Sequence, residues 1–375
     1  MTLNNPVFPS DHPLKNTPTI LVHVNFHKTQ EEEYLVEFRE LAASAGVIAV
    51  DLVQATRSAP DPKYFVGKGK AQQILESLKA HDAHMVLFNH ALSPSQKRSL
   101  EQLYQCRVLD RTELILEIFA ARARTFEGKL QVELAQLQYL ATRLVRGWTH
   151  LERQKGGIGL RGGPGEKQLE VDRRLLRNRI KAITQRLEKV RKQRSLSRRT
   201  RQRSAVPTVA LVGYTNAGKS TLFNRLTHAE VEVADKLFAT LDPTLRRIQL
   251  PELGSVVLAD TVGFIRDLPH HLVEAFRATL EEVLSADLLL HVVDAHNPEK
   301  RQYIEAVNEV IEQLGAEKVP QLLVYNKLDL VPGATFEIEY NPQGLPTSVA
   351  VSAVTGEGID ILKQAIKETL AIQHE

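Results

Sequence analysis

Short apolar runs alternate with amphipathic segments over the first third of the chain. The apolar runs predict buried strands and the amphipathic segments predict surface helices, because a surface helix is apolar on one face only. The expected strands are 19–25, 47–53, 85–88 and 107–110, and the expected helices are 31–45, 70–80 and 95–104. This alternation predicts a small parallel α/β subdomain over residues 19–128, preceded by a flexible tail over residues 1–18.

From residue 129 the apolar positions recur at alternating steps of four and three. The stripe comprises Leu130, Leu134, Leu137, Ala141, Leu144, Trp148 and Leu151, and it resumes at Leu176, Ile180, Ile183, Leu187 and Val190. Such spacing is typical of long helices that pack together, so we expect an antiparallel helical hairpin over residues 129–197. Six glycines in residues 156–165 predict an irregular loop at its tip, and the basic residues 198–204 predict a linker.

Five further apolar runs lie in the last part of the chain, at 208–212, 255–259, 288–293, 321–325 and 348–351. Helical patterns separate them, which predicts a doubly wound sheet in a domain over residues 205–375. The expected fold class of the whole chain is therefore α/β. In a doubly wound sheet, ligands bind where the parallel strands end, so the residues after each run are the first candidates for chemistry.

The first of these strands leads into Gly213-Tyr-Thr-Asn-Ala-Gly-Lys-Ser220, a complete phosphate-binding loop followed by a helical pattern. Glycines let the backbone N–H groups turn onto phosphate oxygens, Lys219 reaches the β- and γ-phosphates, and the Ser220 hydroxyl can bind Mg²⁺. The expected nucleotide-binding residues here are Gly213, Tyr214, Thr215, Asn216, Ala217, Gly218, Lys219, Ser220 and Thr221. Val66-Gly-Lys-Gly-Lys70 lacks the full spacing and predicts only a turn into a helix.

Asp260-Thr-Val-Gly263 follows the next strand and provides a second cluster. Asp260 can hold the Mg²⁺ shell, and the Gly263 N–H can contact a γ-phosphate, so the segment after it senses hydrolysis. Thr240 is the expected mobile threonine that binds Mg²⁺, and Thr244 is the weaker alternative. The expected metal ligands are Ser220, Thr240 and Asp260, and the expected catalytic residues are Lys219, Asn216, Thr240 and Gly263.

Two more clusters predict the base. The Asp329 carboxylate in Asn326-Lys-Leu-Asp329 can accept hydrogen bonds from the N1–H and 2-amino groups of guanine. Adenine does not offer these donors, so the sequence favours a GTPase over an ATPase. Asn326 is expected to brace the loop and the stem of Lys327 to cover the base. The loop with Ser352, Ala353 and Val354 completes the site, and the Ala353 N–H is expected to contact guanine O6.

The net charge of +3 is distributed unevenly: −1 over residues 1–128, +15 over 129–204 and −11 over 205–375. A basic segment beside an acidic domain predicts a polyanionic partner, although a solvated, arginine-rich hairpin is the alternative. Exposed glycine backbone and guanidinium groups suit RNA, and we expect no DNA. The expected RNA contacts are Lys155, Arg161, Lys167, Arg173, Arg174 and Arg177.

Bulk properties limit the compartment. Cys106 is the single cysteine, so no internal disulfide can form, which fits a reducing compartment. The first ten residues lack a signal-peptide pattern, and no apolar run approaches membrane-spanning length. We therefore expect a cytoplasmic, monomeric protein without a membrane segment.

These motifs resemble those of known GTPases. Residues 205–375 resemble a GTPase of the translation-factor class, and residues 19–375 resemble the HflX family of ribosome-associated GTPases. Besides the phosphate loop, the match rests on Tyr64–Lys70, Gly156–Glu166, Phe238–Thr244, Asp260–Ile265 and Asn326–Asp329. The resemblance implies GTP hydrolysis, binding to the large ribosomal subunit with the hairpin tip directed to its catalytic centre, and splitting of stalled or idle ribosomes under stress, including heat.

One position departs from many relatives. They carry a glutamine after the Asp-x-x-Gly motif that orients the attacking water, whereas this chain has Phe264. In similar GTPases with a hydrophobic residue here, the loop position that Asn216 occupies helps to coordinate a K⁺ ion near the phosphates, and the resemblance implies the same role for Asn216. Alternatively, the ribosome supplies the missing groups. Two other functions stay open, an RNA-binding factor in subunit assembly and a regulatory switch that recruits proteins through the hairpin.

Overall fold

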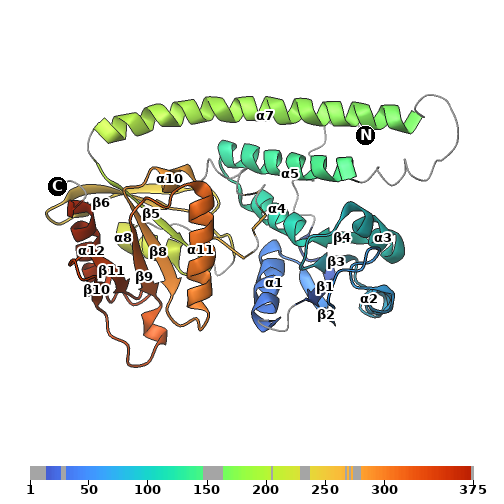
Figure 1. Ribbon diagram of the computed structural model, residues 1–375, viewed down its shortest axis with the longest axis horizontal. Coiled ribbons are helices and arrows are strands. Elements are labelled where there is room, and N and C mark those ends of the chain that lie inside the picture. The colour runs from blue at the N-terminus through green and yellow to red at the C-terminus, as the bar shows by residue number, and fades with distance from the viewer. Residues whose placement is uncertain are drawn as a thin grey trace. The chain divides into compact units, whose positions relative to one another are not determined.

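The computed structural model describes residues 14–26, 31–146, 164–203, 206–228, 237–266, 268–269, 272 and 280–372. The chain divides into two compact units (Figure 1). The N-terminal unit comprises Met1–Ala121 and Lys129–Leu187, and the C-terminal unit comprises Arg122–Gly128 and Glu188–Glu375. Each unit has its own sheet, and the predicted α/β fold class is confirmed.

The N-terminal unit contains a four-stranded sheet in the order β2-β1-β3-β4, and its neighbouring strands are parallel. The strands are β1 (Pro18–Asn25), β2 (Ile48–Thr56), β3 (Met85–Phe88) and β4 (Arg107–Asp110), and the helices between them are α1 (Glu31–Ala45), α2 (Lys68–Ala80) and α3 (Pro94–Tyr104). Gly67 is the N-cap of α2 with φ 85°, so Val66–Lys70 is a turn into a helix, as predicted. The strand–helix alternation predicted for this part of the chain is present.

The predicted tail is wrong for its last residues. The Leu14 side chain is buried, the Asn16 N–H donates to the Gly46 carbonyl, and β1 already begins at Pro18. Apolar burial and a backbone hydrogen bond therefore fix residues 14–16 to the N-terminal unit, and Pro18 already belongs to its sheet. Residues 1–13 lie outside the described residues.

Helix α4 (Arg111–Arg122) follows β4 directly and was not predicted. Every residue from Arg111 to Phe119 is buried, so the helix lacks the polar face that periodicity detects. Its charged side chains are paired: Arg111 with Glu37, Glu113 with Lys97 at 2.6 Å, and Glu117 with Arg107 at 2.6 Å. Pairing compensates for the cost of burying these charges.

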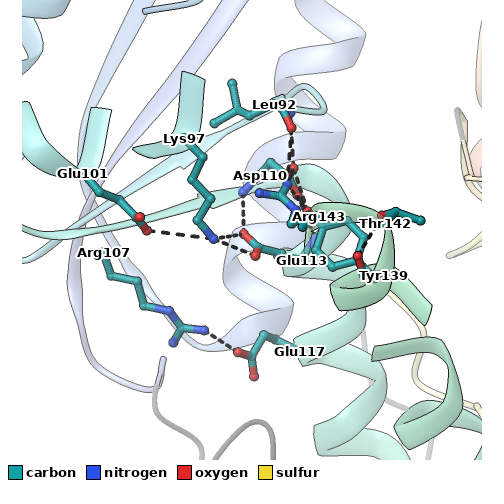
Figure 2. A network of polar contacts seen from close by, with 10 residues as sticks. All are labelled: Leu92, Lys97, Glu101, Arg107, Asp110, Glu113, Glu117, Tyr139, Thr142 and Arg143. Carbon is teal, nitrogen blue, oxygen red and sulfur yellow. Dashed lines mark hydrogen bonds and ion pairs between the residues drawn. The ribbon is translucent and has the colours of Figure 1, made fainter. Parts of the chain in front are cut away.

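A polar network surrounds the end of β4 (Figure 2). The fully buried Asp110 carboxylate accepts hydrogen bonds from the Tyr139 hydroxyl at 2.8 Å, the Leu92 N–H at 3.2 Å and the Arg143 guanidinium. Burial raises the pKa of the nearby Glu113 carboxyl, and the Asp110 charge acts in the same direction. Because Tyr139 and Arg143 lie on α5 (Phe126–Arg146), the network fixes that helix to the sheet.

Helix α5 packs against α7 (Pro164–Arg203) as the two arms of the hairpin (Figure 1). Their contact contains Leu130, Leu134, Leu137, Leu176, Ile183 and Leu187, all from the stripe that the heptad spacing identified. Arg179 on α7 also bonds to Glu133 on α5 at 2.8 Å. Helix α7 continues to Arg203, so most of the segment predicted as a linker over 198–204 is helical. Residues 147–163, with most of the tip loop, lie outside the described residues.

The C-terminal unit contains a seven-stranded sheet in the order β10-β11-β9-β8-β5-β7-β6. The parallel strands are β5 (Thr208–Gly213), β7 (Gly254–Asp260), β8 (Leu288–Asp294), β9 (Gln321–Asn326) and β11 (Pro346–Ala350), close to the predicted bounds. Edge strands β6 (Thr244–Leu250) and β10 (Ile338–Tyr340) were not predicted, and they pair antiparallel to their neighbours.

Helices cover both faces of this sheet (Figure 1). The helical elements are α8 (Lys219–Thr227), α10 (Glu281–Leu284), α11 (Lys300–Leu314), the 3₁₀ helix η1 (Leu328–Leu330) and α12 (Ile359–Ile372). On one face, α8 and α12 bury Phe223 and Leu362 against alternate strand residues such as Leu211 and Leu290. This packing fixes the strand ends and leaves the loops after them to form a site. None of the helices in the described part of the chain has both the length and the apolar character of a membrane span.

Candidate functional site

Parallel register brings the predicted motifs to one edge of the seven-stranded sheet. Leu211 of β5 pairs with Asp260 of β7, and Gly213 pairs with Val292 of β8. Asp294 at the end of β8 pairs with Asn326 at the end of β9. The phosphate-loop glycine, both motif residues Asp260 and Asn326, and the loop after β11 therefore follow neighbouring strand ends, where ligands bind in this class of sheet.

The phosphate loop between β5 and α8 has backbone angles that suit glycine. Gly213 and Gly218 have φ values of 145° and 89°. A Cβ at Gly213 would lie 2.3 Å from the Val292 carbonyl oxygen, and one at Gly218 would lie 2.2 Å from Asn326 Nδ2. Asn216, also left-handed with φ 62°, is exposed. Its side chain makes no hydrogen bond to any residue that the structure describes, so the amide is available to a ligand.

Lys219 is the first residue of α8, and its side chain turns back over the loop. Its ammonium donates to the carbonyl oxygens of Gly213 at 3.1 Å and Tyr214 at 2.7 Å. Burial lowers the pKa of Lys219 to about 8, and the Asp260 carboxylate opposes that shift. A buried cation held by carbonyl oxygens, at the N-terminus of a helix, is a suitable partner for phosphate oxygens.

Ser220, Thr240 and Asp260 lie together. Asp260 Oδ2 accepts from Ser220 Oγ at 2.7 Å and from Thr240 Oγ1 at 3.1 Å, and the two hydroxyls are 2.9 Å apart. Burial raises the pKa of Asp260. Its Oδ1 is buried without a hydrogen-bond partner among the described residues. An unpaired carboxylate oxygen beside two hydroxyls is an oxygen donor set that fits Mg²⁺. Thr244 lies in β6 opposite Asp260 in the ladder.

The segment after Asp260 pairs with the phosphate loop. The Phe264 N–H donates to the Gly213 carbonyl at 3.1 Å, and its carbonyl accepts from the Thr215 N–H at 2.8 Å. A Cβ on Gly263 would lie 3.0 Å from Lys219 Nζ, which places this glycine beside the predicted γ-phosphate position. The Phe264 side chain is fully buried and carries no polar group.

An aromatic contact that the motifs did not predict supports this segment. The rings of Tyr214 and Tyr303 on α11 stack with their centroids 4.1 Å apart. The Tyr214 hydroxyl accepts the Arg266 N–H at 2.7 Å, and the Arg266 guanidinium lies 4.8 Å from the centre of the Tyr303 ring. Tyr303 lies far from both motifs in the sequence and in an ordinary amphipathic helix, so no local pattern identifies it.

Asn326 joins the phosphate loop to the loop after β11. Its Nδ2 donates to the Ala217 carbonyl at 2.9 Å, and its Oδ1 accepts the Ala353 N–H at 2.9 Å. The predicted bracing role of Asn326 thus has a defined geometry. The Ala353 N–H, which was expected to contact guanine O6, is directed to Asn326, and a contact with the base would require it to be shared.

The remaining base-site residues surround η1. Lys327 has φ 62°, and its ammonium bonds to Asp294 Oδ2 at 2.8 Å. The Asp329 side chain is exposed, so its carboxylate is accessible to a ligand. Arg225 of α8 was not predicted; its Nε donates to the Ala353 carbonyl at 3.0 Å and its Nη2 donates to the Val354 carbonyl. Since Arg225 and Ala353 are 128 residues apart, only the fold reveals this contact.

The candidate RNA contacts are only partly described. Lys155 and Arg161 lie outside the described residues, and Lys167 lies in the first turn of α7, where only the backbone is described. Arg173 is half-buried, whereas Arg174 and Arg177 are exposed on α7. No nucleic acid contact is defined by this geometry.

Family models match most of the chain. Residues 32–120 match the model described as the N-terminal region of a GTP-binding GTPase, and residues 122–201 match its middle region. Residues 208–327 match the model described as a 50S ribosome-binding GTPase. The matched ranges follow the order of the predicted subdomain, hairpin and nucleotide site.

Individual proteins are similar over nearly the whole chain. The GTPase HflX of Escherichia coli (strain K12) is 61% identical over 94% of this chain and 82% of its own length. The GTPase HflX of Magnetococcus marinus is 51% identical over 90% of this chain and 78% of its own length. The crystal structure of SsGBP with GDP has a TM-score of 0.53 at 24% identity and covers 95% of this chain and 99% of its own. That last likeness shows the fold, which is that of a GTP-binding protein.

Proposed function

This chain belongs to the HflX family of GTPases, and from that premise we propose that it binds the large ribosomal subunit and uses GTP to split stalled or idle ribosomes under stress. GTP hydrolysis is the activity of the family, and it accounts for the phosphate loop and its companion motifs. The ribosomal partner and the splitting reaction are the proposed part.

The observation that carries the proposal is a basic helical segment that precedes a GTPase domain in the chain. Residues 129–204 have a net charge of +15, and residues 208–327 match the ribosome-binding GTPase model. Arg174 and Arg177 are exposed on α7, so their guanidinium groups can reach phosphate oxygens. Phosphate contacts dominate binding to structured RNA, which makes ribosomal RNA a suitable partner for this surface.

We assign each strand-end residue a role in binding GTP. The N–H groups of the phosphate loop and the Lys219 ammonium hold the phosphates. Mg²⁺, which the bound nucleotide requires, would be held by Ser220, Thr240 and Asp260 and would neutralise charge on the β- and γ-phosphates. Asp329 selects guanine through its exposed carboxylate. The Gly263 N–H reports the γ-phosphate to the segment that follows it.

Slow intrinsic hydrolysis follows from Phe264. The side chain is buried and carries no polar group, so it cannot orient water. We propose that the side-chain oxygen of Asn216, an exposed residue of the phosphate loop, helps to hold a K⁺ ion that offsets charge on the phosphates as they react. Contact with the ribosome is then the natural trigger for faster hydrolysis.

Co-sedimentation with purified ribosomal subunits tests the partner. We expect association with the large subunit in the presence of a non-hydrolysable GTP analogue, weaker association with GDP, and a steep fall in affinity as salt rises. Equal binding to both subunits, or binding that ignores the nucleotide, would refute the proposal.

Charge variants provide a matched control. Replacing Arg174 and Arg177 with Ala removes two positive charges from α7, and replacing Arg246 and Arg247 with Ala removes the same charge from exposed positions on β6. We expect only the α7 replacements to weaken ribosome binding. They should also make the slope of log affinity against log salt concentration shallower by the amount of about two phosphate contacts. Equal effects of the two pairs would indicate attraction by net charge alone.

A further inference from the structure

The loop that carries Thr240 makes a second contact, away from the nucleotide site. The Asp242 carboxylate accepts hydrogen bonds from the Arg124 N–H at 2.8 Å, from the Thr125 N–H at 2.9 Å and from the Thr125 hydroxyl. Asp242 and the segment Arg122–Gly128 belong to the same compact unit. Three donors on two consecutive residues form a specific contact, not a chance surface approach.

This contact lies at the start of the first hairpin helix. Helix α5 begins at Phe126, and Thr125 is its N-cap, since Thr125 Oγ1 accepts the Gly128 N–H at 2.9 Å. The first N–H groups of a helix lack intrahelical partners, and an N-cap stabilises a helix by about 1 kcal/mol. Asp242 orients this N-cap and places a negative charge at the positive end of the helix dipole.

Gly128 makes the close approach possible. A Cβ at Gly128 would lie 2.2 Å from Asp242 Oδ1 and 3.1 Å from Thr125 Oγ1. Any other residue there would push the carboxylate and the N-cap apart. Asp242, Thr125 and Gly128 therefore act as one unit, which we call the α5 clamp.

The α5 clamp lies next to the Mg²⁺ site along the chain. Asp242 follows Thr240 by two residues, and the intervening Leu241 is buried. Thr240 Oγ1 lies 2.9 Å from Ser220 Oγ and 3.1 Å from Asp260 Oδ2. Between the two contacts the chain has little freedom, because Leu241 is packed and Pro243 has a fixed φ.

We propose that Asp242 is a positioning residue, which holds Thr240 at the Mg²⁺ and γ-phosphate site by fixing the loop to the N-cap of α5. This inference rests on the assignment of Thr240 given under the proposed function. In GTPases the γ-phosphate and Mg²⁺ order this loop, and they release it after hydrolysis. Linkage is reciprocal, so one coupling free energy applies in both directions. The free energy by which the clamp strengthens triphosphate binding equals the free energy by which a bound triphosphate stabilises the clamp at the start of α5.

The clamp thus connects the nucleotide state to α5, the first helix of the hairpin. Residues Arg122–Gly128 join α4 to the rest of α5, both of which belong to the N-terminal unit, yet the segment itself belongs to the C-terminal unit. A change in the position of Asp242 therefore acts on the short segment through which the chain passes from one unit to the other.

Nucleotide affinity of the isolated protein provides the first test. For Asp242→Ala and Gly128→Ala, we expect about fivefold to tenfold weaker binding of a non-hydrolysable GTP analogue with Mg²⁺, and GDP affinity within about twofold of wild type. Thr125→Ser keeps the hydroxyl and should bind normally. Gly69→Ala is the matched control, because it adds a Cβ in the first turn of α2 with no heavy atom within 4 Å.

Hydrogen exchange of the same proteins provides a readout that does not depend on activity. In the wild type, amides of residues 122–130 should exchange more slowly with the analogue than with GDP, and both clamp variants should lose this difference. Equal losses of analogue and GDP affinity, or an exchange difference that persists in both variants, would overturn the proposal. No ribosomes are present, so a failure of the ribosomal partner would leave these measurements unaffected.

Discussion

Asn326→Ala is the substitution whose effect can be worked most directly from the structure. The Asn326 side chain is buried and connects two backbone groups, the Ala217 carbonyl and the Ala353 N–H, each at 2.9 Å. Removing it leaves a buried acceptor and a buried donor without partners. Each unsatisfied buried group costs roughly 1–3 kcal/mol, so the two groups together cost about 2–6 kcal/mol.

That loss should fall mainly on nucleotide binding, because the two loops surround the ligand. If about half of this cost, roughly 1–3 kcal/mol, is lost from binding, guanine nucleotide affinity falls by roughly 5- to 150-fold. Titration with a fluorescent GDP derivative measures the loss of affinity, and thermal unfolding of the nucleotide-free protein measures the loss of stability.

Asn341→Ala is the matched control. The Asn341 side chain also bonds to two backbone groups, the N–H groups of Gln343 and Leu345, but in an exposed turn. We expect less than about 1 kcal/mol of destabilisation and normal nucleotide affinity, since water replaces the lost acceptor. Asn326→Ala with GDP affinity and unfolding temperature both close to wild type would refute this reasoning.

Three other predictions follow from single residues. Asp329→Asn should lower GTP affinity by about 100-fold and improve binding of xanthosine triphosphate, because the amide donates where the carboxylate accepted; unchanged GTP affinity in competition titrations would sink the assignment of the base. GTP hydrolysis should be at least about tenfold faster in KCl than in NaCl, and Asn216→Gly, which retains the φ of 62°, should abolish the difference; equal rates in the two salts for the wild type would remove the K⁺ site. His90 Nε2 accepts the Val24 N–H at 3.2 Å, and burial lowers the pKa of His90 to about 4. Stability from this neutral histidine is complete above its unfolded pKa of about 6.5 and is lost as pH falls towards 4, so His90 alone should make the protein about 2 kcal/mol less stable at pH 5 than at pH 7. Buried His291, whose pKa is also lowered to about 4, adds to the same trend. In denaturant unfolding, His90→Gln should therefore reduce the difference between pH 5 and pH 7 by about 2 kcal/mol, and an unchanged pH dependence would contradict this role of His90.

Patterns within one element were enough to predict most of the fold. The parallel strands of both sheets and the α5–α7 stripe are apolar in a regular way, and regular burial is what periodicity detects. Helix α4 was not predicted because it is buried on all sides from Arg111 to Phe119, including charged side chains whose partners lie on other elements. Strand β6 was not predicted because it is an edge strand whose residues are mostly exposed or half-buried.

The nucleotide motifs could be predicted because each motif is local and its chemistry follows from residue type. What could not be predicted is how distant motifs share hydrogen bonds. Three hydrogen bonds join residues more than 25 positions apart: Ala353 N–H to Asn326, Arg225 to the Val354 carbonyl, and Thr125 N–H to Asp242. Each depends on tertiary packing, which no single stretch of sequence encodes.

Sucrose-gradient sedimentation of intact ribosomes tests the central claim most directly. Idle ribosomes are incubated with the full chain and either GTP, a non-hydrolysable analogue or GDP. With GTP or the analogue, we predict that the peak of intact ribosomes disappears, that peaks of the separate subunits appear, and that the protein sediments with the large subunit. With GDP, the peak of intact ribosomes should persist. An intact peak under all three conditions, even with the protein bound to large subunits, would contradict splitting and would favour a role in subunit assembly.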